Sequence, residues 1–137
     1  MAMWTLLDHP ADLAVEGRGD TPEAALAAVV EGLLAQLGPR DPHPGPPEDI
    51  AIEGFDQEES LVSALNELLY QINVQQRWLA CPEVLELGET RVRLRVRSRR
   101  RPADQALQTE IKAATYHDLQ LTATPGGSWR LQVLFDV

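Results

Sequence analysis

Cysteine and histidine are scarce in this chain of 137 residues, which contains one cysteine, Cys81, and three histidines, His9, His43 and His117. A single cysteine excludes a disulfide within the chain and any zinc site built from several cysteines. The small number of histidines also argues against a histidine-rich metal site.

Long hydrophobic runs are absent as well. The longest uninterrupted apolar run covers residues 24–30, whereas a membrane-spanning helix needs about 20 such residues. The N-terminal residues also lack the pattern of a secretory signal peptide. The sequence therefore predicts a cytoplasmic protein with no membrane partner.

Basic residues are also scarce. The chain has 12 lysines and arginines against 21 acidic residues, which gives a net charge of −9. This acidic excess is not typical of a general nucleic-acid binder. The basic residues are concentrated in residues 91–101, where Arg91, Arg93, Arg95 and Arg97 alternate with apolar residues. This stripe would either pair with acids on a neighbouring strand or face a phosphate backbone or an acidic partner.

Hydrophobic periodicity predicts an α+β fold formed by one domain, residues 1–137. We expect a largely antiparallel sheet with two main helices packed on one face. Thr21 and Pro22 form a typical helix start, and Pro82 indicates an edge strand. The expected order is ββαβα followed by four strands: strands 4–7 and 12–17, helix 22–37, strand 49–53, helix 57–75, and strands 84–87, 90–98, 110–124 and 128–137.

Carboxylates occur at the ends of two expected strands that are far apart in sequence. Asp136 is next to the terminal carboxylate of Val137, and Asp12 precedes a short alternating run. If these strands meet, three anionic groups converge and require a counter-cation. Oxygen ligands suit Ca²⁺, Mg²⁺ or Mn²⁺. The alternative is that both aspartates are solvated residues at strand ends.

Polar and titratable residues are also concentrated in residues 111–119, inside the expected strand 110–124. Strand alternation would place Lys112, Tyr116 and Asp118 on one face, and Thr115 and His117 on the other. Such a segment is either part of a functional site or a surface strand with cross-strand pairs.

Five short segments in this order resemble the archease family over essentially the whole chain. They are Asp8-His9-Pro10-Ala11-Asp12, Leu65-Asn66-Glu67-Leu68-Leu69-Tyr70, Gly88-Glu89, Ile111-Lys112-Ala113-Ala114-Thr115-Tyr116-His117 and Phe135-Asp136-Val137. The chain departs from the family pattern at Pro10, usually threonine, at Ala114, usually valine, and at Val137, usually isoleucine.

The resemblance implies an accessory protein of an RtcB-type RNA ligase rather than an enzyme. Such ligases join RNA 3′-phosphate or 2′,3′-cyclic phosphate ends to 5′-hydroxyl ends in tRNA splicing or RNA repair. Archeases promote guanylylation of the ligase and its multiple turnover, so RNA would be contacted through the ligase.

The resemblance also implies a divalent metal, most often calcium, on Asp12, Asp136 and the carboxylate of Val137. His9, Lys112 and His117 would lie close to it. Two alternatives remain at this point: an RNA-binding chaperone that uses Arg91, Arg93, Arg95 and Arg97, and a metal-dependent hydrolase with Asp12 and Asp136 as ligands.

Overall fold

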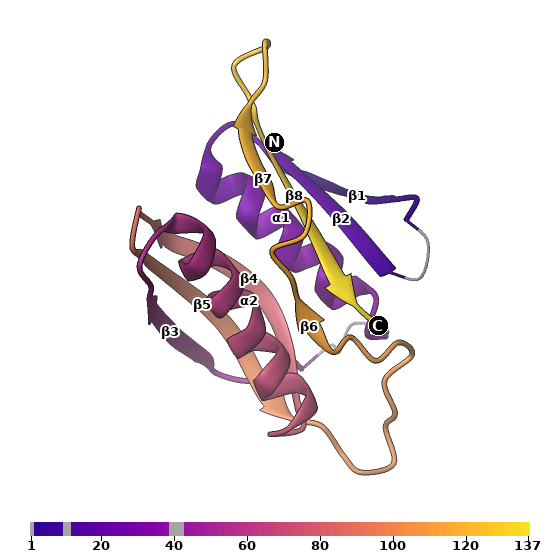
Figure 1. Ribbon diagram of the computed structural model, residues 1–137. Coiled ribbons are helices and arrows are strands. Elements are labelled where there is room, and N and C mark those ends of the chain that lie inside the picture. Colours follow the sequence, from indigo (N-terminus) through magenta and orange to yellow (C-terminus); the bar gives the residue numbers. More distant parts are fainter. Residues whose placement is uncertain (1, 10–11, 39–42) are drawn as a thin grey trace.

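The structure is a computed structural model that describes residues 2–9, 12–38 and 43–137 (Figure 1). The described residues form two helices and eight strands, and the order ββαβα followed by strands confirms the predicted α+β class. The elements are β1 (Met3–Leu7), β2 (Asp12–Gly19), α1 (Pro22–Ala35), β3 (Pro47–Glu53), α2 (Gln57–Asn73), β4 (Arg77–Leu87), β5 (Arg91–Arg100), β6 (Ala113–Ala114), β7 (Gln120–Ala123) and β8 (Trp129–Asp136).

The strands divide between two antiparallel sheets, where the sequence predicted one. The larger sheet has the order β1-β2-β8-β6, with β7 also paired to β8, and the smaller has the order β3-β5-β4. Helix α1 packs on β1, β2 and β8 but also on β4, whereas α2 packs on the smaller sheet and on β6 (Figure 1). The two helices therefore do not share one face of one sheet.

The composition of α1 gives the physical reason for this arrangement. Its buried residues include Ala25, Leu26, Val29, Val30 and Leu33, so most of its circumference is apolar. A helix that is apolar nearly all round must be covered on more than one side. Contacts with both sheets provide that cover.

Two glycines of β2 allow α1 to lie directly against the larger sheet. A Cβ atom at Gly17 would lie 2.3 Å from the carbonyl oxygen of Ala25, and one at Gly19 would lie 2.4 Å from Cβ of Ala24. No larger residue fits without moving the helix away from the strand. The predicted start of this helix is also confirmed, because Oγ1 of Thr21 accepts a hydrogen bond from the Ala24 N–H at 3.1 Å.

Strand β4 is an edge strand, as Pro82 predicted, but it is longer than expected. Pro82 lies where the register with β5 shifts between Ala80 and Glu83. Cys81 adopts a positive φ of 53° at this point. A bulge on a sheet edge tolerates proline because no ladder hydrogen bond requires its missing N–H.

The expected strand 110–124 is wrong in its extent, since only β6 and β7 are strands within it. The chain turns between them: the Leu119 N–H donates to the carbonyl oxygen of Tyr116 at 3.2 Å, and Asp118 has a φ of 53°. The hydrogen-bonded turn takes residues 116–119 out of the pairing with β8, and the positive φ of Asp118 departs from the extended conformation of a strand. Strand alternation therefore does not decide where the side chains of residues 115–118 lie.

One continuous hydrophobic core joins the two sheets and both helices. It includes Leu26 of α1, Leu65 of α2, Val92 of β5 and Phe135 of β8. Within the described parts of the chain, no helix has both the length and the apolar character needed to cross a membrane.

Candidate metal site

Asp12 and Asp136 lie directly opposite each other where β2 begins and β8 ends. Residues paired in this way on antiparallel strands have Cβ atoms about 4.5–5.5 Å apart, with both side chains on the same face of the sheet. The structure thus brings together the two aspartates that the sequence singled out. Val137 follows Asp136, has an exposed fraction of 47%, and lies at the end of the chain beside β6 (Figure 1).

His9 lies against this pair of carboxylates. Its Nδ1 atom is 3.3 Å from Oδ2 of Asp12. The same nitrogen is buried and makes no hydrogen bond with a described residue. The imidazole of His9 also meets that of His117 edge to face, with ring centroids 6.2 Å apart and planes at 79°. The neighbouring residues Pro10 and Ala11 lie outside the described residues, so the consequence of Pro10 for the motif is not described.

The main chain of Lys112 is hydrogen-bonded to Asp136 at the end of β8. Its N–H donates to the carbonyl oxygen of Asp136 at 2.7 Å, and the next residue, Ala113, pairs with Asp136 in β6. The side chain of Lys112 is exposed. The structure therefore gathers His9, Asp12, Lys112, His117 and Asp136 at one end of the larger sheet.

Two amide side chains of α2 hold the segment that carries Lys112 and His117. Asn66 accepts a hydrogen bond from the Ala114 N–H at 2.7 Å and donates one to the Ala114 carbonyl oxygen at 3.3 Å. Asn73 donates to the carbonyl oxygen of Ile111 at 2.8 Å. Sequence reasoning assigned neither asparagine a role. The available signal was a polar residue, Asn66, beside the apolar stripe of the helix.

The donor set fits a divalent cation. Two carboxylates face each other with no basic side chain between them in the strand register, and like charges directly opposite each other on neighbouring strands are destabilising. The buried Nδ1 of His9 adds an unpartnered polar atom beside Asp12. Carboxylate oxygens are the ligands that Ca²⁺ and Mg²⁺ prefer. The assignment of Asp12, Asp136 and Val137 as metal ligands stays a prediction.

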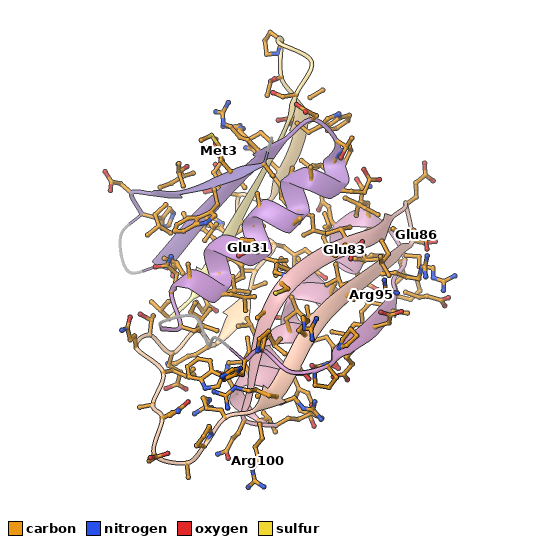
Figure 2. The ribbon with its side chains drawn as sticks, turned by 180° about the vertical axis from the view of Figure 1, so that it is seen from behind. Met3, Glu31, Glu83, Glu86, Arg95 and Arg100 are labelled. Carbon is orange, nitrogen blue, oxygen red and sulfur yellow. The ribbon has the colours of Figure 1, made fainter. Side chains whose placement is uncertain are left out.

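The arginine stripe on β5 lies on the other sheet and is largely paired within the chain. Nε of Arg93 is 2.9 Å and Nε of Arg91 is 3.6 Å from Oε1 of Glu86. Arg97 donates to the carbonyl oxygen of Gly45 at 2.6 Å. Figure 2 shows Glu86 near one end of this sheet, Glu83 and Arg95 farther along it, and Arg100 at the other end.

Arg95 makes a bidentate pair with Asp49. Its Nε and Nη2 atoms donate to the two carboxylate oxygens of Asp49 at 2.7 and 3.2 Å. These hydrogen bonds, together with the charges of Arg95 and Arg93, hold the pKa of Asp49 below its usual value of 3.8. Intramolecular pairing is the first of the two roles expected for this stripe, and it leaves less cationic surface for a phosphate backbone.

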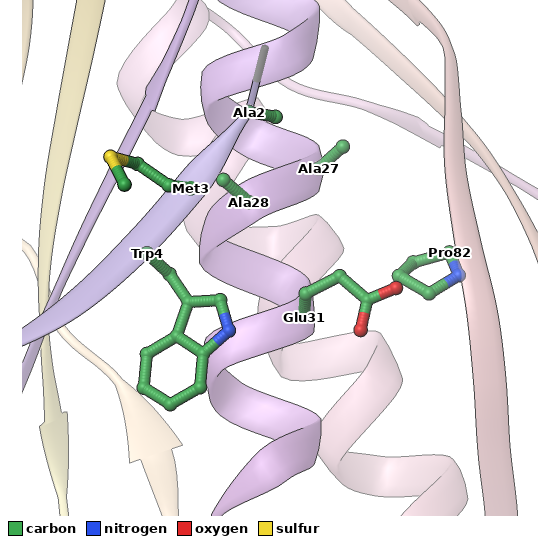
Figure 3. Close-up of a pocket in the computed structure, with 7 residues that line it drawn as sticks. All are labelled: Ala2, Met3, Trp4, Ala27, Ala28, Glu31 and Pro82. Carbon is green, nitrogen blue, oxygen red and sulfur yellow. The ribbon is translucent and has the colours of Figure 1, made fainter.

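A pocket of about 380 Å³ lies between β1, α1 and β4 (Figure 3). Trp4 and Met3 line one side of it, and Glu31 and Pro82 line the other. None of the predicted site residues is among the described residues that line this pocket. The pocket and the carboxylate pair are therefore separate features.

The chain matches the model of the Archease protein family over residues 4–137. It is 30% identical to the protein archease of Pyrococcus furiosus and 31% identical to that of Thermococcus gammatolerans. Each alignment covers 100% of both chains.

Two solved structures are similar to this fold. The solution structure of protein 1598 of Methanobacterium thermoautotrophicum superposes with a TM-score of 0.72 at 16% identity, covering 98% of each chain. The crystal structure of an archease from Thermotoga maritima, described as a possible chaperone, has a TM-score of 0.65 at 25% identity. That similarity covers 96% of this chain and 94% of the other.

Proposed function

Because the chain belongs to the archease family, we propose that it is an accessory activator of an RtcB-type RNA ligase. In this role it promotes guanylylation of the ligase and its multiple turnover during tRNA splicing or RNA repair. The ligase joins 3′-phosphate or 2′,3′-cyclic phosphate ends of RNA to 5′-hydroxyl ends. The protein acts on the ligase and contacts RNA only through it.

The observation that carries this proposal is the pairing of Asp12 with Asp136 across β2 and β8. Together with the carboxylate of Val137, these residues would hold a divalent cation, and calcium suits a set of carboxylate oxygens. The cation would supply positive charge where the carboxylates otherwise repel each other. His9 would orient Asp12 through the contact of 3.3 Å between Nδ1 and Oδ2.

The exposed side chains around this cluster supply groups that recognise phosphate. Lys112 is exposed, and the imidazole of His117 has an exposed fraction of 69%. An ammonium group and an imidazole can both donate hydrogen bonds to phosphate oxygens. These two residues are therefore the proposed contacts with the nucleotide or the phosphorylated site of the partner.

A role without catalysis is supported by the hydroxyl group of Thr115, which lies between Lys112 and His117 in the sequence. Oγ1 of Thr115 donates to the carbonyl oxygen of Leu134 at 3.0 Å, so it serves to attach the segment to β8. A nucleophile would instead need a base within hydrogen-bond reach.

The test is transfer of radiolabelled guanylate from GTP to a purified RtcB-type ligase in the presence of substoichiometric protein. We expect the wild-type protein and Asp104→Asn, a change in an exposed loop, to accelerate transfer equally. Asp136→Asn should not accelerate it. The protein alone should join no RNA.

Two results would contradict the proposal in different ways. No acceleration by the wild-type protein would reject the role as a ligase activator. Equal acceleration by wild type and Asp136→Asn would reject the carboxylate pair as the functional feature while retaining the activator role.

A further inference from the structure

A second group of potential metal ligands lies beside the carboxylate pair and uses two of the three histidines. His9, His117 and Asp118 each offer one ligand atom, and these three atoms lie within 4.8 Å of one another. Nε2 of His117 is 3.5 Å from Oδ2 of Asp118. The sequence argued against a site with several histidines, but the fold brings together residues that are far apart along the chain.

The turn between β6 and β7 positions two of these side chains. Asp118 has a φ of 53°, a left-handed conformation that aspartate and asparagine adopt more readily than most residues. The carbonyl oxygen of Asp118 accepts a hydrogen bond from Nε2 of Gln132 in β8 at 3.2 Å. The turn is thereby attached to the same strand that carries Asp136.

Asp12 lies beside the third side chain, that of His9. Its Oδ2 atom lies 3.3 Å from Nδ1 of His9. A carboxylate that accepts a hydrogen bond from one ring nitrogen is the usual companion of a metal-binding histidine, because it sets the ring orientation and raises the basicity of the other nitrogen. Nδ1 of His9 makes no hydrogen bond with a described residue, and a small rotation of the ring would direct it at Asp12.

We propose that His9, His117 and Asp118 form a binding site for a first-row transition metal ion, with Zn²⁺ as its best match. Imidazole nitrogens suit Zn²⁺, Co²⁺ and Ni²⁺, whereas an oxygen-only site suits Ca²⁺ and Mg²⁺. The donor set therefore differs in chemistry from the set formed by Asp12, Asp136 and Val137. Three protein ligands also leave a coordination position for water or for a phosphate oxygen of a bound partner.

The distances allow such a site after a small movement. Ligand atoms about 2.0–2.1 Å from a tetrahedral ion lie about 3.3 Å from one another. The side chains of His117 and Asp118 have exposed fractions of 69% and 52%, so rotamer changes can bring their atoms closer. His9 is less exposed, at 28%, and serves as the fixed ligand.

The test uses Co²⁺ as a spectroscopic substitute for Zn²⁺, added to the full chain in the presence of saturating Ca²⁺ and without any ligase. We expect the wild-type protein to develop the visible absorption of nitrogen-bound Co²⁺ and to release Co²⁺ when Zn²⁺ is added. His9→Ala and His117→Ala should each weaken Co²⁺ binding by about tenfold or more. Asp118→Asn, which preserves the preference for the left-handed conformation, should weaken it as well.

The control is His43→Ala, which removes the remaining histidine and should leave the absorption and the affinity unchanged. Melting temperatures in a chelator should match among all variants, which shows that the substitutions leave the fold intact. Asp136→Asn separates the two sites, because it removes a ligand of the oxygen site only.

The inference is overturned if wild type and His117→Ala bind Co²⁺ equally, or if Asp136→Asn abolishes the absorption as completely as His117→Ala does. The second outcome would place Co²⁺ among the carboxylates. Because no ligase is present, neither outcome depends on the proposed activator function, and a failed ligase assay leaves this result standing.

Discussion

The side chain of Asn66 pairs with the main chain of Ala114 in both directions, although 48 residues separate them. Oδ1 accepts from the Ala114 N–H, and Nδ2 donates to its carbonyl oxygen. The amide thus behaves like one residue of a neighbouring strand and completes the free edge of β6. The Asn66 side chain of α2 thus forms the hydrogen bonds that a further strand beside β6 would otherwise form.

Asn66→Ala should lower the free energy of unfolding by about 1–3 kcal/mol. The reason is that Ala114 has an exposed fraction of only 5%, so its N–H would be left without a partner in a buried place. Urea unfolding followed by circular dichroism measures the change. Gln75→Ala, just beyond the end of α2 and exposed, should change stability by less than about 0.5 kcal/mol. Equal effects of the two substitutions would show that the amide pairing contributes nothing.

Calcium should stabilise the folded protein through Asp12 and Asp136. A ligand that binds only the folded state at about 100 times its dissociation constant adds about 2.7 kcal/mol, so the melting temperature should rise with added Ca²⁺. Asp12→Asn should lose this rise, and Asp104→Asn should keep it. Differential scanning fluorimetry in Ca²⁺ and in a chelator gives both values. An unchanged response in Asp12→Asn would remove Asp12 from the set of ligands.

Extending the chain beyond Val137 by two glycines should weaken calcium binding and ligase activation. The extension converts the carboxylate into an amide and so removes one negative charge and one oxygen ligand. The same extension placed before Met1 should have little effect. Val137→Ile, which restores the usual family residue and keeps the carboxylate, should behave like the wild type in both assays. If the two extensions are tolerated equally, the carboxylate of Val137 is not a ligand.

The pair of Asp49 and Arg95 should make stability depend on acid pH. Hydrogen bonds from Arg95 lower the pKa of Asp49 in the folded state below 3.8. The pair therefore contributes stability that is present above this pH and is lost as the pH falls from 3.8 through the lower folded-state value. Asp49→Asn should be less stable than the wild type at neutral pH, and the difference should vanish in acid.

The measurement for this pair is urea unfolding over a pH series at two salt concentrations. Because both side chains are exposed, the difference should be small and should shrink in high salt. Asp104→Asn serves as the control and should show no such pH dependence relative to the wild type. A difference between wild type and Asp49→Asn that persists below the pH range of carboxylate titration would contradict the pairing.

Local signals in the sequence predicted most of the elements. Hydrophobic periodicity identified the helix 57–75, which corresponds to α2, and Thr21 and Pro22 marked the start of α1. Each of these signals depends on residues close together along the chain. The division of the strands between two sheets depends on distant pairings, and strand patterns alone do not specify which partner each strand takes.

The residues of the candidate site could also be predicted only where the signal was local in the sequence. Carboxylates near both ends of the sequence suggested the chemistry of a cation site, and the register of β2 with β8 supplied the geometry. The turn at Asp118 was missed because the polar run 111–119 has strand-like alternation. Its actual partners, Asn66 on α2 and Gln132 on β8, lie elsewhere in the chain.

The position of β8 in the larger sheet has a consequence for how the protein matures in the cell. This strand joins β2 on one side to β6 and β7 on the other, yet it is synthesised after the other strands that the structure describes. A nascent chain has Asp12 from the start but acquires Asp136 only when translation of β8 is complete. The two carboxylates therefore face each other only after β8 has joined β2, and copies truncated before β8 lack both the centre of the larger sheet and the proposed cation site.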